Sequence, residues 1–257
     1  MFSMKKLIFQ KRDKKGAICI SLLLAAMLPG ICGCSASDLT DDQPVEESTV
    51  EKESEQPKEP KDPLADESAS DGKIDFEALQ VLNPDIFGWI YIPDIGIDQP
   101  LLQNIQEDPD YYSMHDAYSN SGGAAAYIEY PDSPEMRDFN EIIYGLDPDK
   151  VLGLRDPDTF KKAGNIYIHT AEGRSLYSIV AARKWENADI ATRYAFVFGY
   201  EQERFIRDLQ ETMSLSDNIK DSYRDVSLGD CLITLAVPME EDSGSQFIVV
   251  ARLNTLN

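Results

Sequence analysis

Apolar and polar positions alternate over many short stretches of this chain, mainly between residues 88 and 253. A period of two is typical of β-strands with one buried face, and clusters rich in Gly, Pro, Asn and Asp separate the stretches. Many short strands and few helices predict a mostly β fold whose sheet closes, or nearly closes, into a barrel. Eight strands are expected, at residues 88–93, 97–103, 124–130, 140–145, 165–170, 174–185, 230–237 and 246–253.

Two helical patterns accompany the strands. The first covers residues 74–82 and stops before Pro84, because the residue that precedes a proline disfavours the helical conformation. The second covers residues 201–213, in the insertion between Trp185 and Asp230. Its apolar residues recur at helical spacing, which predicts a helix that covers one face of the sheet.

Composition divides the chain into three segments. Residues 1–33 begin with basic residues and contain an apolar run that is shorter than the roughly 20 residues of a membrane-spanning helix, as is typical of a signal peptide. Residues 34–73 are acidic and lack any apolar period, so a disordered tether is expected. Residues 74–257 are left for the barrel domain, which is long enough to bury a self-sufficient core.

The apolar run ends in Ile31-Cys32-Gly33-Cys34, which resembles the lipobox of bacterial lipoproteins. The resemblance implies that Cys34 receives a lipid and that the preceding residues are removed. The lipid would hold the domain outside the cytoplasm, anchored to the cell membrane and facing the cell wall. An uncleaved signal anchor, and cleavage without lipid attachment, are the alternatives.

Charge and cysteine content limit the possible partners. The chain has 46 acidic and 24 basic residues, and its formal net charge of -22 would repel a phosphate backbone, so nucleic-acid binding is not expected. With the signal removed and Cys34 acylated, Cys231 is the remaining thiol. One thiol forms neither an internal disulfide nor a structural zinc site, and we predict no cofactor and no metal ligands.

Several segments, taken together and in order, resemble the class B sortases, which are cysteine transpeptidases that anchor proteins to bacterial cell walls. The resemblance covers nearly all of residues 74–257 and implies a sortase-like β-barrel with an N-terminal helix and a helical insertion before the last two strands. The segments are NPDIFGWIYIPDIGIDQPLLQ at 83–103, DYYSMHDAYSNSGGAAAYIEY at 110–130, NEIIYGLDPDKVLGLRD at 140–156, and DCLITLAVP and SQFIVVARL within 230–253.

The resemblance also implies three working positions, and each holds a different kind of residue here. Leu146 stands where the family has a His that acts as acid and base, Pro238 where it has the nucleophilic Cys, and Gln246 where it has an Arg that stabilises the oxyanion. Acyl transfer to a thiol needs all three kinds of group. We therefore predict no catalytic residues, and a sortase-like surface lipoprotein that binds or scaffolds a peptide or surface protein.

Two other functions remain open: an active transpeptidase or hydrolase that uses other residues, and a binding module that shares only the fold. Cys231 lies seven residues before Pro238, about 23 Å away along a strand, and is expected to be a buried core residue. His115 and His169 are expected to be surface or hydrogen-bonded residues and not general bases.

Acidic residues follow two of the strand ends that would be neighbours in such a barrel. We hypothesise that this acidic rim binds a cation such as Ca²⁺, or a basic segment of a partner. The alternative is a solvated acidic loop in a chain that is acidic throughout. The rim consists of Asp147, Asp149, Glu240, Glu241 and Asp242.

Overall fold

The computed structural model describes residues 62–106, 108–186, 190–211, 217–242 and 244–256. The signal segment, Cys34 and most of the expected tether lie outside these ranges, so the expectations for them remain predictions. Within the described ranges, no helix combines the length and the apolar content that crossing a bilayer requires.

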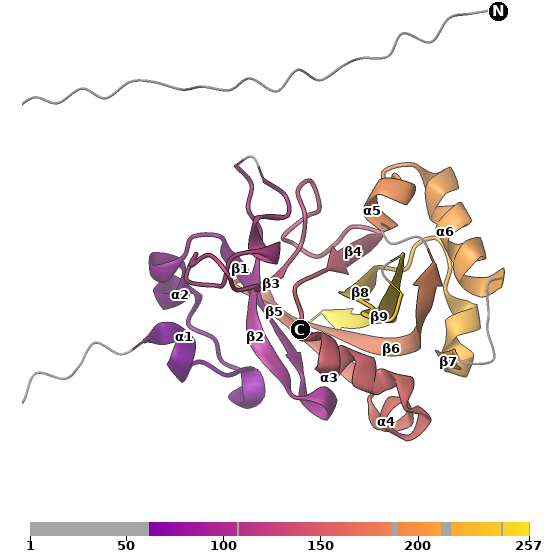
Figure 1. Cartoon of the computed structure of the whole chain (residues 1–257), viewed down its shortest axis with the longest axis horizontal. Coiled ribbons are helices and arrows are strands. Elements are labelled where there is room, and N and C mark those ends of the chain that lie inside the picture. Colours follow the sequence, from indigo (N-terminus) through magenta and orange to yellow (C-terminus); the bar gives the residue numbers. More distant parts are fainter. Residues whose placement is uncertain (1–61, 107, 187–189, 212–216, 243, 257) are drawn as a thin grey trace, which may run out of the picture. The chain divides into compact units, whose positions relative to one another are not determined.

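One sheet of nine strands forms the framework (Figure 1). Its order is β3-β2-β1-β5-β6-β9-β8-β4, and β7 pairs with β6 outside this path. The β2–β3 and β4–β8 pairs are parallel and the other pairs are antiparallel. The strands are β1 (Ile86–Ile92), β2 (Ile97–Leu102), β3 (Ala126–Tyr127), β4 (Asn140–Ile143), β5 (Asn165–Thr170), β6 (Gly173–Glu186), β7 (Asn218–Ile219), β8 (Leu232–Pro238) and β9 (Ser245–Leu256).

The two ends of the strand order, β3 and β4, are joined by a single bridge. Tyr127 of β3 donates its N–H to the carbonyl of Tyr144 at 3.1 Å, and Tyr144 donates back to Tyr127 at 2.9 Å. Gly145 permits this close approach, because its φ is +70° and a Cβ there would lie 1.9 Å from the carbonyl oxygen of Ala125. The bridge completes the barrel-like sheet that the strand pattern predicts.

Both faces of the sheet are buried at β4 and along nearly all of β8. Successive residues of a strand point to opposite sides, so two sets of residues pack there. The interior is lined by one set of alternating residues, which in the last two strands comprises Ile233, Leu235, Val237, Phe247, Val249 and Ala251. The other set, which includes Leu232, Ala236, Ile248 and Val250, lies outside the barrel. It packs there against residues of the insertion, among them Phe205 and Leu209.

Short helices cover the outside of the sheet. Helix α2 begins where the Asp75 carboxylate accepts a hydrogen bond from the N–H of Ala78, and it buries Leu79 beside β1. Helix α6 buries Phe205 and Leu209 against the outer side of β6, β8 and β9 (Figure 1). The helices are α1 (Pro63–Asp66), α2 (Phe76–Leu82), α3 (Pro148–Leu152), α4 (Pro157–Lys162), α5 (Ile190–Arg193) and α6 (Gly199–Glu211).

All eight strands expected from the alternation are present, and α2 and α6 correspond to the two expected helices. The sequence pattern did not predict β7, which has two residues, nor the short helices α1, α3, α4 and α5, which have four to six residues each. Segments this short do not complete a recognisable period. Three of these helices, α1, α3 and α4, do begin with an Asp-Pro pair, in which Asp62, Asp147 and Asp156 act as N-caps.

Residues 62–73 differ from the expected tether, because they pack on the barrel. Ala69 is 3% exposed, and Leu64 packs against the cluster that contains Trp89. The carboxylate of Asp98 in β2 accepts hydrogen bonds from the Ser68 hydroxyl at 2.6 Å and the Ala69 N–H at 3.0 Å. The folded part therefore begins before Ile74, because isolated apolar residues that cannot form a core alone can still complete one formed by other segments.

Candidate functional site

Three strand ends meet at one edge of the barrel. Strands β4 and β8 run parallel, with Ile143 opposite Leu235, and β9 returns antiparallel beside β8. Residues that follow β4, end β8 and begin β9 therefore share this edge. They include the three positions that the sequence comparison singles out, namely Leu146, Pro238 and Gln246.

Leu146 is part of the hydrophobic interior. Its side chain is 3% exposed and belongs to the same buried cluster as Val237 and Met239. The next residue, Asp147, caps α3 by accepting a hydrogen bond from the N–H of Asp149 at 3.0 Å. Position 146 thus places an aliphatic side chain in the core, and it offers no group that can transfer a proton.

Pro238 and Gln246 are partners in the register of the last two strands. Pro238 is exposed, whereas Gln246 is half-buried and its Oε1 has no hydrogen-bond partner among the described residues. Proline has neither a side-chain heteroatom nor a backbone N–H. The amide of glutamine can donate a hydrogen bond but carries no charge.

A guanidinium lies near this edge, but it is already paired. The Cζ atom of Arg155 lies 5.4 Å from the ring centroid of Phe247, the neighbour of Gln246 in β9. Its Nη1 atom forms an ion pair with Oε1 of Glu241 at 2.6 Å. Arg155 therefore neutralises one of the rim acids.

The acidic rim is largely occupied by contacts within the chain. In addition to Asp147 at its cap and Glu241 beside Arg155, Asp242 pairs with Lys184 at 2.6 Å and accepts a hydrogen bond from the hydroxyl of Ser245 at 3.0 Å. The hydrogen bond from Lys184 holds the pKa of Asp242 below its usual range. This pairing favours an acidic loop balanced by its own bases over a cation site at the rim.

Cys231 lies at the opposite end of β8, just before the strand begins, and its Sγ is 3.8 Å from the carbonyl oxygen of Arg137. The residue is half-buried and not the fully buried core residue that was expected, because it precedes the paired part of the strand. Burial raises the pKa of the thiol, and Asp230 and Glu141 act in the same direction. A thiol in this environment forms little of the nucleophilic thiolate.

The two histidines lie in other parts of the fold. The ring of His115 stacks on Tyr111 with centroids 3.8 Å apart, and its Nδ1 is 2.8 Å from the Tyr111 carbonyl oxygen. His169 is 5% exposed on β5, which β6 and β9 separate from β8. Burial lowers the pKa of His169, and Arg174 adds to that effect. Neither imidazole belongs to β4, β8 or β9, the strands whose ends form this edge.

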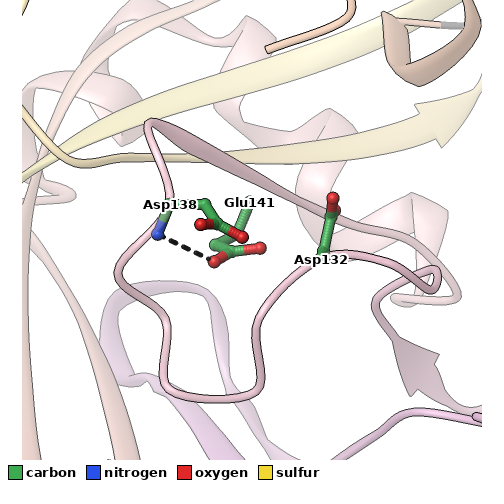
Figure 2. A group of neighbouring side chains, drawn as sticks. All are labelled: Asp132, Asp138 and Glu141. Carbon is green, nitrogen blue, oxygen red and sulfur yellow. Dashed lines mark hydrogen bonds between the residues drawn. The ribbon is translucent and has the colours of Figure 1, made fainter. Parts of the chain in front are cut away.

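A second cluster, which the sequence analysis did not single out, lies at the other end of β4. Asp132 and Asp138 come from the loop between β3 and β4, and Glu141 from β4 itself (Figure 2). One carboxylate oxygen from each lies within 4.8 Å of the other two. The signal in the sequence was four acidic residues between positions 132 and 141, of which three form the cluster, but in a chain with 46 acidic residues such spacing is not distinctive.

The electrostatics of this cluster differ from those of the rim. Burial raises the pKa of Asp132 to about 7, with the charge of Asp138 acting in the same direction. Burial also raises the pKa of Glu141 to about 8, and Asp132 and Asp138 add to it. Glu141 is fully buried, with 0% exposure. Ionisation of all three carboxyl groups together is unfavourable in free energy unless a positively charged partner joins them.

Comparisons with known proteins identify the fold. No family model matches the sequence. A stretch of 69 residues, or 26% of this chain, is 45% identical to sortase B of Listeria monocytogenes and spans 27% of that protein, so the match covers about a quarter of the relative's length. The crystal structure of Clostridium perfringens sortase B superposes with a TM-score of 0.61 at 19% identity, covering 70% of this chain and all of that one (100%).

A Staphylococcus aureus sortase B–substrate complex superposes with a TM-score of 0.59 at 19% identity, covering 71% of this chain and 85% of that chain. Together with the local match to the Listeria protein, these similarities show that the chain has a class B sortase-like fold. The resemblance stated from the strand segments is confirmed at the level of fold.

Proposed function

We propose that this chain is a catalytically inactive, class B sortase-like lipoprotein that binds a peptide or surface protein at the envelope of a Gram-positive cell. One observation carries the proposal: Leu146, Pro238 and Gln246, at the edge where β4, β8 and β9 meet, supply no nucleophile, no proton donor and no positive charge. Loss of the nucleophile alone typically costs about 10⁶-fold in rate, and groups that act as a unit fail together.

Retention of the fold supports binding. The barrel interior, the closure at Tyr127 and Tyr144, and the helical insertion are all present, although no reactive group would require them. A solved relative, the S. aureus sortase B, is described with its substrate bound. The net charge of -22 favours a neutral or basic ligand.

The catalytic part is tested by incubating the purified full-length chain, in mild detergent, with a sorting-signal peptide and an amine acceptor. We expect saturable peptide binding and no acyl-transfer product, even at high protein concentration and long incubation. Product formation that Cys231→Ala abolishes would replace the proposal with an active enzyme that uses a non-standard nucleophile. Absence of both binding and turnover would favour a module that shares only the fold.

The anchoring part is tested separately in cells that are labelled with a fatty-acid analogue. Cys34→Ala should lose the label and leave the membrane fraction, whereas Cys32→Ala, a matched thiol two residues earlier, should retain both the label and the membrane association. Equal labelling of the two variants would contradict lipid attachment at Cys34.

A further inference from the structure

The interior face of the barrel includes a carboxylate that lacks a full set of partners. Glu141 lies on β4 two residues before Ile143, so the two side chains point to the same interior face. Its exposure is 0%, its Oε1 accepts a hydrogen bond from the N–H of Asp138 at 3.2 Å, and its Oε2 has no hydrogen-bond partner in the described part of the chain. Buried polar atoms are nearly always paired, so this oxygen points to a missing partner.

The surrounding carboxylates indicate what that partner is. Figure 2 shows Asp138 and Glu141 with their carboxylates close together and Asp132 on the other side of the same loop. Ca²⁺ binds oxygen at 2.3–2.6 Å, so two oxygens on opposite sides of one ion lie about 4.6–5.2 Å apart. The three ligand oxygens lie within 4.8 Å of one another, which is within the separation of two oxygens bound to one Ca²⁺.

The loop that supplies two of these carboxylates is fixed by strands on both sides. Gln103, which follows β2, donates hydrogen bonds from Nε2 to the carbonyl oxygens of Asp132 at 2.7 Å and of Glu129 at 3.2 Å. The hydroxyl of Tyr177 in β6 donates to the carbonyl oxygen of Met136 at 3.1 Å. Asp138 is exposed, so one carboxylate of the cluster is in contact with solvent. Within the described residues, lysine and arginine side chains form ion pairs with acidic residues other than Asp132, Asp138 and Glu141.

We propose that Asp132, Asp138 and Glu141 form a Ca²⁺-binding site that ties the β3–β4 loop to the interior end of β4. The three carboxylates supply the hard oxygen ligands that Ca²⁺ prefers, and water completes its coordination. The smaller Mg²⁺ requires shorter bonds and gives up its waters reluctantly, so it is expected to bind more weakly. The site lies at the end of β4 away from Leu146, and the proposal does not depend on the proposed function.

The test measures thermal unfolding of the full-length chain in mild detergent, first in EDTA and then in CaCl₂ up to about 10 mM. An ion that binds only the folded state raises the midpoint in a saturable manner, and we expect a shift of about 5 °C. Calorimetric titration of the wild-type chain should give one Ca²⁺ per chain. No shift and no binding heat with Ca²⁺ would overturn the proposal. An equal affinity for Mg²⁺ would overturn the assignment to Ca²⁺.

Variants locate the ion. Glu141→Gln should abolish the shift, and Asp138→Asn, a change at the exposed ligand that preserves shape, should weaken binding by at least the 10- to 100-fold typical of lost metal partners. The matched control is the double variant Asp149→Asn with Glu240→Gln, which removes two rim acids and should keep the full shift. If the control loses the shift while Asp138→Asn retains wild-type affinity, the ion binds at the rim and the proposal is wrong.

Discussion

Pro238 of β8 lies directly opposite Gln246 of β9 in the register of the last two strands. The sequence resemblance predicts that these two positions correspond to the thiol and the guanidinium of class B sortases. Here a proline faces the neutral amide of a glutamine. Leu146 reaches the same edge from β4, but its side chain is part of the packed interior. Leu146 and Pro238 are therefore in different environments, and substitutions at the two positions should change the free energy of unfolding by different amounts.

Introduction of an imidazole at position 146 should destabilise the fold, whereas introduction of a thiol at position 238 should be tolerated. Leu146→His places a polar ring in a site that is 3% exposed, and we expect a loss of about 2–4 kcal/mol in the free energy of unfolding. Pro238→Cys changes an exposed residue and should stay within about 0.5 kcal/mol of wild type. Urea denaturation of the two variants provides the comparison, and equal stabilities would show that position 146 is not a packed core site.

Closure of the barrel should depend on Gly145. An alanine there would keep the strained φ of +70° and place its Cβ 1.9 Å from the carbonyl oxygen of Ala125. We expect Gly145→Ala to lower the free energy of unfolding by more than about 3 kcal/mol. The control is Gly153→Ala, where a Cβ would meet nothing within 4 Å. A similar effect of both substitutions would contradict the role given to the Tyr127–Tyr144 bridge.

The thiol of Cys231 should react slowly. Burial and the nearby acids raise its pKa, so the thiolate fraction at neutral pH is smaller than that of an exposed cysteine. Alkylation of the Cys34→Ala/Cys32→Ala/Cys19→Ala variant by iodoacetamide, followed by mass spectrometry, should be at least about tenfold slower than alkylation of free cysteine at pH 7. Reaction as fast as that of the free amino acid would reopen the case for Cys231 as a nucleophile.

Stability in EDTA should fall as the pH rises from about 5 to 8. Burial raises the pKa of Glu141 to about 8, above its value in the unfolded chain, and Asp132 and Asp138 face it and act in the same direction. The folded state therefore keeps a proton that the unfolded state releases, at a cost of about 1.4 kcal/mol per pH unit for one such group.

Urea midpoints measured across this pH range provide the test. Glu141→Gln should flatten the profile by at least about 1 kcal/mol between pH 5 and 8, because its amide does not titrate. The control is Asp158→Asn, because Asp158 is exposed whereas Glu141 is buried. This variant should keep the wild-type dependence of the urea midpoint on pH. Parallel profiles for wild type and Glu141→Gln would show that this carboxyl does not titrate in the manner described.

The strands, and the residue types at the three positions that the family resemblance points to, could be read from the sequence alone. Alternation marks a strand because each residue turns its side chain to one face or the other, and this depends only on local geometry. The eight expected strands and the two longer helices follow from such patterns. The chemical nature of Leu146, Pro238 and Gln246 is likewise a property of the chain, whatever its fold.

Only the tertiary structure decided which distant residues meet. No local pattern shows that the carboxylate of Asp98 accepts a hydrogen bond from the N–H of Ala69. Nor does one show that Glu141 is fully buried on the interior face of the barrel, with carboxylate oxygens of Asp132 and Asp138 within 4.8 Å of its own. These relationships arise from the register of strands far apart in sequence and from the closure of the sheet. A sequence pattern specifies which face a side chain occupies, whereas the assembled barrel specifies what lies opposite it.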